Sequence, residues 1–256
     1  MKTTIALPAL ALSLALAACS ADNDVDDETE LAAEDEDARV AMEALEPVDF
    51  MDLQLGAKIV GPQGPEVKSR MTNADGAFAD ITSYVACPAG MDECDPATAP
   101  EGTIYTYVHI VYPGEDNDPD TGSGEGADAS NVETMEAFRM TMPSHGFTGR
   151  AGYSFAEAGG ALGPVGAVVI SCHEQGIAWT VEEGDGGDQW GQAEPITFFW
   201  QSTLPPAGPS EAYEVFANYT AATGPGPYPA ASETATNACA RATATPAPSP
   251  TPSTAG

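Results

Sequence analysis

The chain has 256 residues and a formal net charge of −31, from 39 Asp and Glu against 8 Lys and Arg. Its apolar fraction of 43% is enough for one sizeable core, which excludes a wholly disordered acidic polypeptide. The charge argues against nucleic-acid binding and against electrostatic docking on anionic lipid headgroups, because both partners would repel it.

Residues 1–18 predict a signal peptide, because a charge at Lys2 precedes an apolar run too short to span a membrane. The next residue completes the sequence Leu-Ala-Ala-Cys ending at Cys19, which resembles the bacterial lipobox. The resemblance implies that Cys19 receives a diacylglycerol and becomes the mature N-terminus. Because Ser20 follows instead of Asp, it also implies the outer membrane of a Gram-negative bacterium. Ordinary secretion is the alternative.

Residues 19–46 contain twelve acidic residues and one base, which predicts a disordered, solvated tether. Within it, Glu28–Leu45 has enough Ala, Leu and Glu to allow a helix ending before Pro47. At the other end, residues 240–256 are rich in Pro, Thr and Ala, which predicts a disordered tail.

Residues 47–239 predict a single β-rich domain of short apolar runs separated by Gly, Pro, Asn and Asp. The strongest strand signal is Thr103–Tyr112, whose alternate residues would place Tyr107 and His109 on one face and Thr106 on the other. We expect His109 to be packed and not a ligand. About nine strands favour an antiparallel β-sandwich, with a partly open barrel as the alternative. The remaining segments expected to be strands are Val165–Cys172, Ile177–Val181, Ile196–Gln201, Tyr213–Tyr219, Leu53–Val60, Phe78–Ala86, Ala137–Met142 and Phe147–Phe155.

With Cys19 lipidated, four cysteines remain in an exported chain, which predicts two structural disulfides. Cys87 and Cys94 bound a short turn-rich segment, so we expect them to pair locally, leaving Cys172 for Cys239. A metal site is the alternative, but the spacing of six residues between the first two cysteines does not match a zinc motif.

An acidic segment after the strongest strand carries Asp116, Asp118 and Asp120, a spacing that lets alternate carboxylates converge on Ca²⁺. It resembles part of an EF-hand-type loop, but the expected glycine falls one position late, at Gly122, and Ala127 occupies the twelfth position. The alternative is a long polar surface loop.

A second acidic cluster, Glu182–Asp188, includes Asp185 and Asp188 and is followed by Trp190. These residues are candidates for a ligand site, because an exposed tryptophan stacks on sugar rings while carboxylates accept hydrogen bonds from hydroxyl groups. The alternative is a solvated hairpin loop beside a tryptophan that fills the core.

No serine, cysteine or histidine pattern matches a catalytic or nucleotide-binding motif. Enzymatic activity is therefore not favoured, although the sequence leaves it open. The leading hypothesis is a non-enzymatic surface-recognition or accessory β-domain of the cell envelope. Its partners would be the membrane, through the lipid on Cys19, and an envelope protein or glycan. The alternatives are a calcium- or carbohydrate-binding module and, less favoured, an envelope hydrolase that uses acidic residues.

Overall fold

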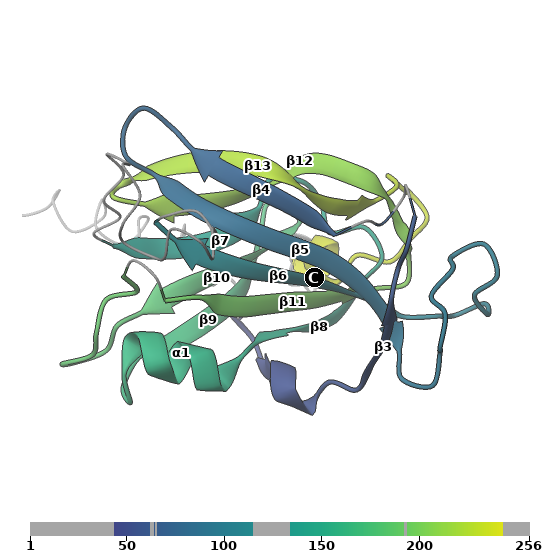
Figure 1. The fold of residues 1–256 in the computed structure, drawn as a ribbon, viewed down its shortest axis with the longest axis horizontal. Helices are drawn as coiled ribbons and strands as arrows, with labels where there is room; N and C mark the ends of the chain where they lie inside the picture. The colour runs from purple at the N-terminus through teal and green to yellow at the C-terminus, as the bar shows by residue number, and fades with distance from the viewer. Residues whose placement is uncertain (1–43, 62–63, 65, 115–133, 192–193, 243–256) are drawn as a thin grey trace, which may run out of the picture. The chain divides into compact units, whose positions relative to one another are not determined.

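The computed structural model describes residues 44–61, 64, 66–114, 134–191 and 194–242, which form two β-sheets (Figure 1). Sheet A has the strand order β1 (Ala44–Leu45), β9 (Ala167–His173), β10 (Gly176–Glu182), β7 (Met135–Met140), β12 (Pro206–Ala217), β13 (Thr220–Pro229). Sheet B has the order β2 (Val48–Asp49), β8 (Phe147–Tyr153), β11 (Ile196–Ser202), β6 (Tyr105–Pro113), β5 (Phe78–Pro88), β3 (Leu55–Lys58), with β4 (Val67–Thr72) paired to β5. The expected all-β fold is confirmed, and one sheet curls as a half-barrel.

The alternation expected in the strongest strand is present in β6. Tyr107 stacks on Trp200 of β11, with ring centroids 4.4 Å apart, and both side chains are fully buried between the sheets. Thr106 is on the opposite, outer face of sheet B, where it accepts a hydrogen bond from Gln201. One face of β6 therefore packs into the core, and the other face contributes to a surface site.

The ring of Phe138 on β7 lies at the centre of the core. It stacks on Trp179 and Tyr213 of the neighbouring strands in sheet A, at 5.6 and 5.7 Å. Across the sandwich it contacts Phe198 at 5.5 Å and His109 at 5.3 Å, and these two residues are directly paired in sheet B. One aromatic cluster thus joins both sheets through stacked and tilted rings, which are favourable arrangements.

His109 is fully buried, as expected for a packed residue. Its Nδ1 shares a 2.9 Å hydrogen bond with Ser83 Oγ, and its ring lies 4.3 Å from that of Tyr213. Burial disfavours the imidazolium form and lowers the pKa of His109 to about 3. The ring therefore stays neutral at physiological pH and contributes packing to the core.

The segment Ala44–Asp49 ties the two sheets together at one edge. Ala44 and Leu45 pair antiparallel with β9 in sheet A, and Val48 and Asp49 pair parallel with β8 in sheet B. Ala44 and Leu45 thus form a strand, so the helix expected to end at Leu45 is wrong for these two residues. Their backbone groups satisfy strand edges that would otherwise be exposed.

Helix α1 (Phe155–Leu162) lies where a strand was expected to end, and it was not predicted. Ser154 caps it by accepting a hydrogen bond from the Glu157 amide at 3.3 Å, which favours a helix start directly after β8. Two glycines in its middle weaken the helical signal in the sequence. The described residues also include the single turn η1 (Phe50–Asp52) and the short helix α2 (Ala238–Ala242).

The β12–β13 hairpin also differs from expectation. The chain turns at Asn218 and Tyr219, which have positive φ angles of 51° and 64°, so the strand expected over Tyr213–Tyr219 ends at Ala217. Strands β4 and β13 were not predicted, because Lys, Arg, Gly and Pro interrupt their apolar residues.

Both expected disulfides are present. Cys87 pairs with Cys94 at the end of β5, and Cys172 pairs with Cys239, which ties α2 to β9. The second bridge spans 67 residues and so constrains the unfolded chain more than the first, which spans 7.

Gly152 lies where the edge segment meets sheet B. A Cβ atom there would lie 1.9 Å from the Val48 carbonyl oxygen and 2.6 Å from the Phe199 ring. The Gly152 carbonyl also accepts a 3.1 Å hydrogen bond from Trp179 Nε1, which links the two sheets. Glycine is therefore required here by close approach of the backbone.

We predict that Gly152→Ala lowers the free energy of unfolding by about 1–3 kcal/mol in urea denaturation, because the added methyl group overpacks this junction. The control is Gly159→Ala, whose Cβ in α1 meets nothing within 4 Å. It should stabilise the protein by up to about 1 kcal/mol through helix propensity. Equal stabilities of Gly152→Ala and the wild type would contradict the proposed junction.

Candidate functional site

A row of paired residues crosses the outer face of sheet B near the ends of β5 and β11. Ala86 pairs with Thr106, and Thr106 pairs with Gln201. Gln201 Nε2 donates a 3.1 Å hydrogen bond to Thr106 Oγ1. Thr106 is 2% exposed, so this pair forms a fixed polar floor on a rigid sheet.

A cavity of about 390 Å³, which we name the Arg150 pocket, lies over this floor. Its apolar lining consists of Leu53, Leu55, Pro88 and Ile104, of which Leu55 and Pro88 are paired between β3 and β5. Its polar lining consists of Asp52, Gln54, Thr106, Arg150 and Gln201. The volume falls within the range of about 300–1,000 Å³ typical of small-molecule sites.

The local fold explains how these side chains meet. Asp49 Oδ1 accepts hydrogen bonds from the amides of Met51 and Phe155, each at 3.2 Å. That carboxylate fixes the turn η1, which brings Asp52 and the following residues over sheet B. Arg150 lies on β8, and its backbone amide donates a 3.3 Å hydrogen bond to Thr148 Oγ1.

Three polar side chains of the pocket are unused within the fold. In the described part of the chain, the side chains of Asp52, Gln54 and Arg150 make no hydrogen bond and no ion pair. All three are exposed at the rim. They can therefore donate to, and accept from, a bound molecule without first breaking a contact within the protein.

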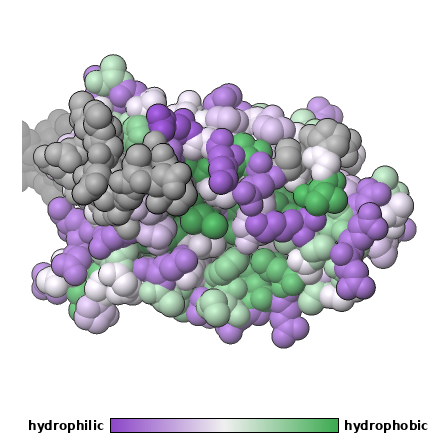
Figure 2. Space-filling view, in the orientation of Figure 1, coloured by the Kyte–Doolittle hydropathy of each residue, from purple (hydrophilic) through white to green (hydrophobic). Residues whose placement is uncertain are grey.

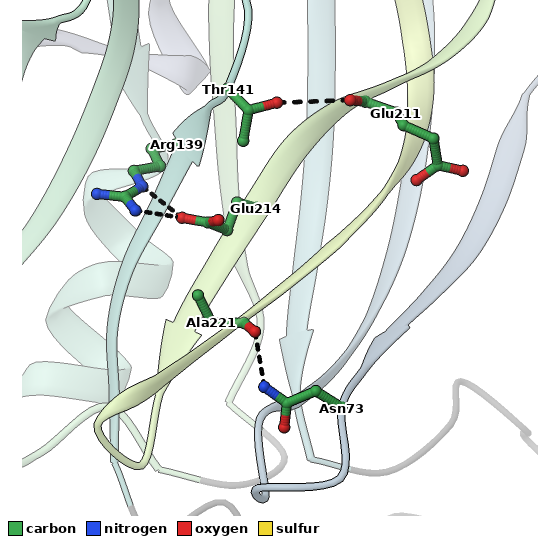
Figure 3. A network of polar contacts seen from close by, with 6 residues as sticks. All are labelled: Asn73, Arg139, Thr141, Glu211, Glu214 and Ala221. Carbon is green, nitrogen blue, oxygen red and sulfur yellow. Dashed lines mark hydrogen bonds and ion pairs between the residues drawn. The ribbon is translucent and has the colours of Figure 1, made fainter.

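The outer face of sheet B also holds most of the basic side chains. Among those whose side chains are described, only Arg139 lies on sheet A, where it pairs with Glu214 (Figure 3). On sheet B, Lys58 pairs with Glu66 at 3.1 Å and Arg70 with Asp80 at 3.6 Å. A space-filling view in the orientation of Figure 1 shows green apolar patches between purple polar groups (Figure 2). This face thus carries four of the five basic side chains that the structure describes.

Tyr84 lies beside Lys58 on this face, and the Lys58 ammonium is 3.7 Å from the centre of its ring. Partial burial raises the pKa of Tyr84, and the charges of Glu66 and Glu157 raise it further. The phenol is therefore a neutral hydrogen-bonding group near neutral pH.

A second cavity, of about 490 Å³, lies near the Cys172–Cys239 bridge and is lined in part by His145, Gln175, Glu233 and Asn237. Most of its polar groups already serve the fold. The Gln175 carbonyl accepts hydrogen bonds from the Ser144 amide and hydroxyl and from Asn237 Nδ2, at 2.9–3.0 Å. This cavity is a junction of three segments, and its hydrogen bonds hold them together.

Trp190, expected to be exposed, is fully buried, so that expectation is wrong. Its Nε1 donates to the Glu194 carbonyl at 2.6 Å, and its ring meets Phe198 edge-on at 5.6 Å. A buried ring cannot stack on a sugar. Its contacts with Glu194 and Phe198 bury the indole, which the flanking glycine and glutamine did not reveal.

Asp185 and Asp188 lie on an exposed turn that follows the C-terminal end of β10, and they do not line the Arg150 pocket. The neighbouring Gln189 Oε1 accepts a 3.3 Å hydrogen bond from Thr134 Oγ1, just after the first acidic segment. Within the described ranges, no three His, Cys, Asp or Glu side chains are grouped as metal ligands would be.

Asp116, Asp118 and Asp120 lie outside the described residues, as does Cys19, so the calcium site and the lipidation stay predictions. In the part of the chain that the structure describes, no helix is both long and apolar enough to cross a membrane.

Sequence reasoning missed the Arg150 pocket. Its polar side chains come from four separate segments, and none forms a motif. The available signal was weak: Thr106 and Gln201 are polar residues at outward positions of two otherwise apolar strands. Such residues mark a surface, and the partner strand must be known before they mark a site.

Comparison with known proteins finds no matching family model, curated protein or solved structure.

Proposed function

We propose that this chain is a lipid-anchored recognition protein of the bacterial cell envelope and that the Arg150 pocket is its binding site. The observation that carries the proposal is the set of unused polar side chains, Asp52, Gln54 and Arg150, over the Thr106–Gln201 floor. Concave sites with a few convergent polar groups and apolar walls are the usual form of a small-molecule site.

The leader supports the anchoring part of the proposal. The lipobox-like sequence ending at Cys19 implies a lipid on the mature N-terminus, and Ser20 implies transfer to the outer membrane. Several acyl chains on one cysteine anchor a protein stably without contact between its folded part and the membrane. The sandwich would thus be held at the envelope surface while its pocket stays open to ligand.

A rigid frame supports the recognition part. Thr106 and Gln201 lie on central strands of sheet B, whose inner faces are locked by Tyr107 and Trp200. Binding groups held on strands keep their geometry better than groups on loops. The pocket would therefore select ligands by the positions of their polar groups.

We predict that the full chain, expressed in a Gram-negative host, takes up an alkyne-labelled fatty acid and partitions into the detergent phase. Cys19→Ala should abolish the label and move the protein to the aqueous phase, because the acceptor thiol is lost. Ser20→Ala is the control and should keep the label. A labelled Cys19→Ala protein, or an unlabelled wild type, would contradict the anchoring.

The binding site is tested by NMR on the full mature chain with four probes: glucose, galacturonate, the dipeptide Ala-Leu and calcium chloride. We expect at least one probe to shift the resonances of Thr106 and Gln201. Gln201→Leu should weaken its binding about tenfold, because both a hydrogen bond to ligand and the fixed floor are lost.

Gln189→Leu, at the exposed turn beyond β10, is the matched control and should bind as the wild type does. Circular dichroism checks that both variants fold. If no probe shifts the pocket residues, or if the shifts centre on His145 and Asn237 in the second cavity, the Arg150 pocket is not the recognition site.

A further inference from the structure

The Arg150 pocket contains two opposite charges that do not neutralise each other. Asp52 and Arg150 both line it, yet they form no ion pair with each other or with any other described residue. Of the other described bases, Lys58, Arg70 and Arg139 each have an acidic partner, and Lys68, which has none, lies outside the pocket. The pocket is thus lined by a guanidinium and a carboxylate that both lack a protein partner.

The groups around the two charges are neutral. Gln54 and Gln201 offer amide donors and acceptors, and Leu53, Leu55 and Pro88 form apolar walls. A ligand that fills the pocket removes water from both charges, which costs free energy unless each gains a partner. A molecule with one anionic and one cationic group meets that requirement, whereas a neutral sugar leaves both charges unpaired.

The charge of the whole chain points the same way. A net charge of −31 repels an anionic ligand at long range and leaves a ligand of zero net charge unaffected. A purely cationic ligand would be attracted, but its charge would lie beside Arg150. A cavity of about 390 Å³ is at the lower end of the size range of small-molecule sites, which limits the ligand to a small molecule.

We propose that the Arg150 pocket binds a zwitterion of amino-acid to dipeptide size. Its carboxylate would lie on the Arg150 guanidinium, which suits two parallel hydrogen bonds, and its ammonium group on the Asp52 carboxylate. Its apolar side chain would lie against Leu53, Leu55 and Pro88. This inference rests on the proposed recognition function and names the ligand class for that same site.

The test compares four forms of Ala-Leu, in both chiralities, by NMR titration of the full mature chain. They are the free dipeptide, its N-acetyl form, its C-terminal amide, and the form with both ends blocked. We expect the free dipeptide to bind about five- to tenfold more tightly than either singly blocked form, because each block removes one charge-assisted hydrogen bond.

Two variants assign the charges to the side chains. Arg150→Gln should remove the preference for a free carboxylate and leave the preference for a free ammonium. Asp52→Asn should do the reverse. Lys68→Gln is the matched control, since Lys68 is another exposed, unpaired cation on sheet B but lies outside the pocket. It should change neither preference.

Equal binding of the free and doubly blocked dipeptides would overturn the zwitterion, as would variants that leave both preferences intact. If glucose or the doubly blocked form still shifts Thr106 and Gln201, the recognition site survives and only the ligand class is wrong. If no dipeptide and no other probe shifts these residues, the proposed function fails as well.

Discussion

The ring of Phe138 packs on both sheets at once, and the geometry of the pocket depends on that contact. On the sheet B side it meets Phe198 and His109, which are paired opposite each other on β11 and β6. The same register puts Gln201 opposite Thr106 on the outer face. A slip of one residue would turn these two polar side chains into the core and apolar ones out to solvent. Core packing therefore fixes the pocket floor.

Parts of this arrangement were predictable because they depend on local pattern. The alternation in Thr103–Tyr112 identified β6 and its two faces, and the spacing of the cysteines identified both disulfides. The pocket was not predictable from the sequence. Asp52 and Arg150 line the same cavity only because β2 pairs with β8 and because Asp49 holds the turn that follows β2. The prediction that Trp190 is exposed was wrong for the same reason, because the residues that bury it, Glu194 and Phe198, follow it in the chain and contact it only in the fold.

The exposed acidic turn and the Arg150 pocket lie in different parts of the sandwich. The exposed turn with Asp185 and Asp188 lies at one end of β10, while the Cys172–Cys239 bridge lies beyond its other end. Arg150 of the pocket lies toward the bridge end, since a Cβ atom built on the preceding Gly149 would lie 3.6 Å from the Cβ of Ala238, next to Cys239. The acidic turn and the proposed binding site thus lie in different parts of the domain.

Native-state hydrogen exchange of Phe138→Ala measures most directly whether the core sets the pocket. We expect a loss of about 3–5 kcal/mol in the free energy of unfolding, because a large buried ring is removed from the core. We also expect protection to fall in β6 and β11 of sheet B as much as in β7 and β12 of sheet A. A loss confined to sheet A, with Thr106 and Gln201 as protected as in the wild type, would show that sheet B keeps its register without Phe138 and would contradict the account.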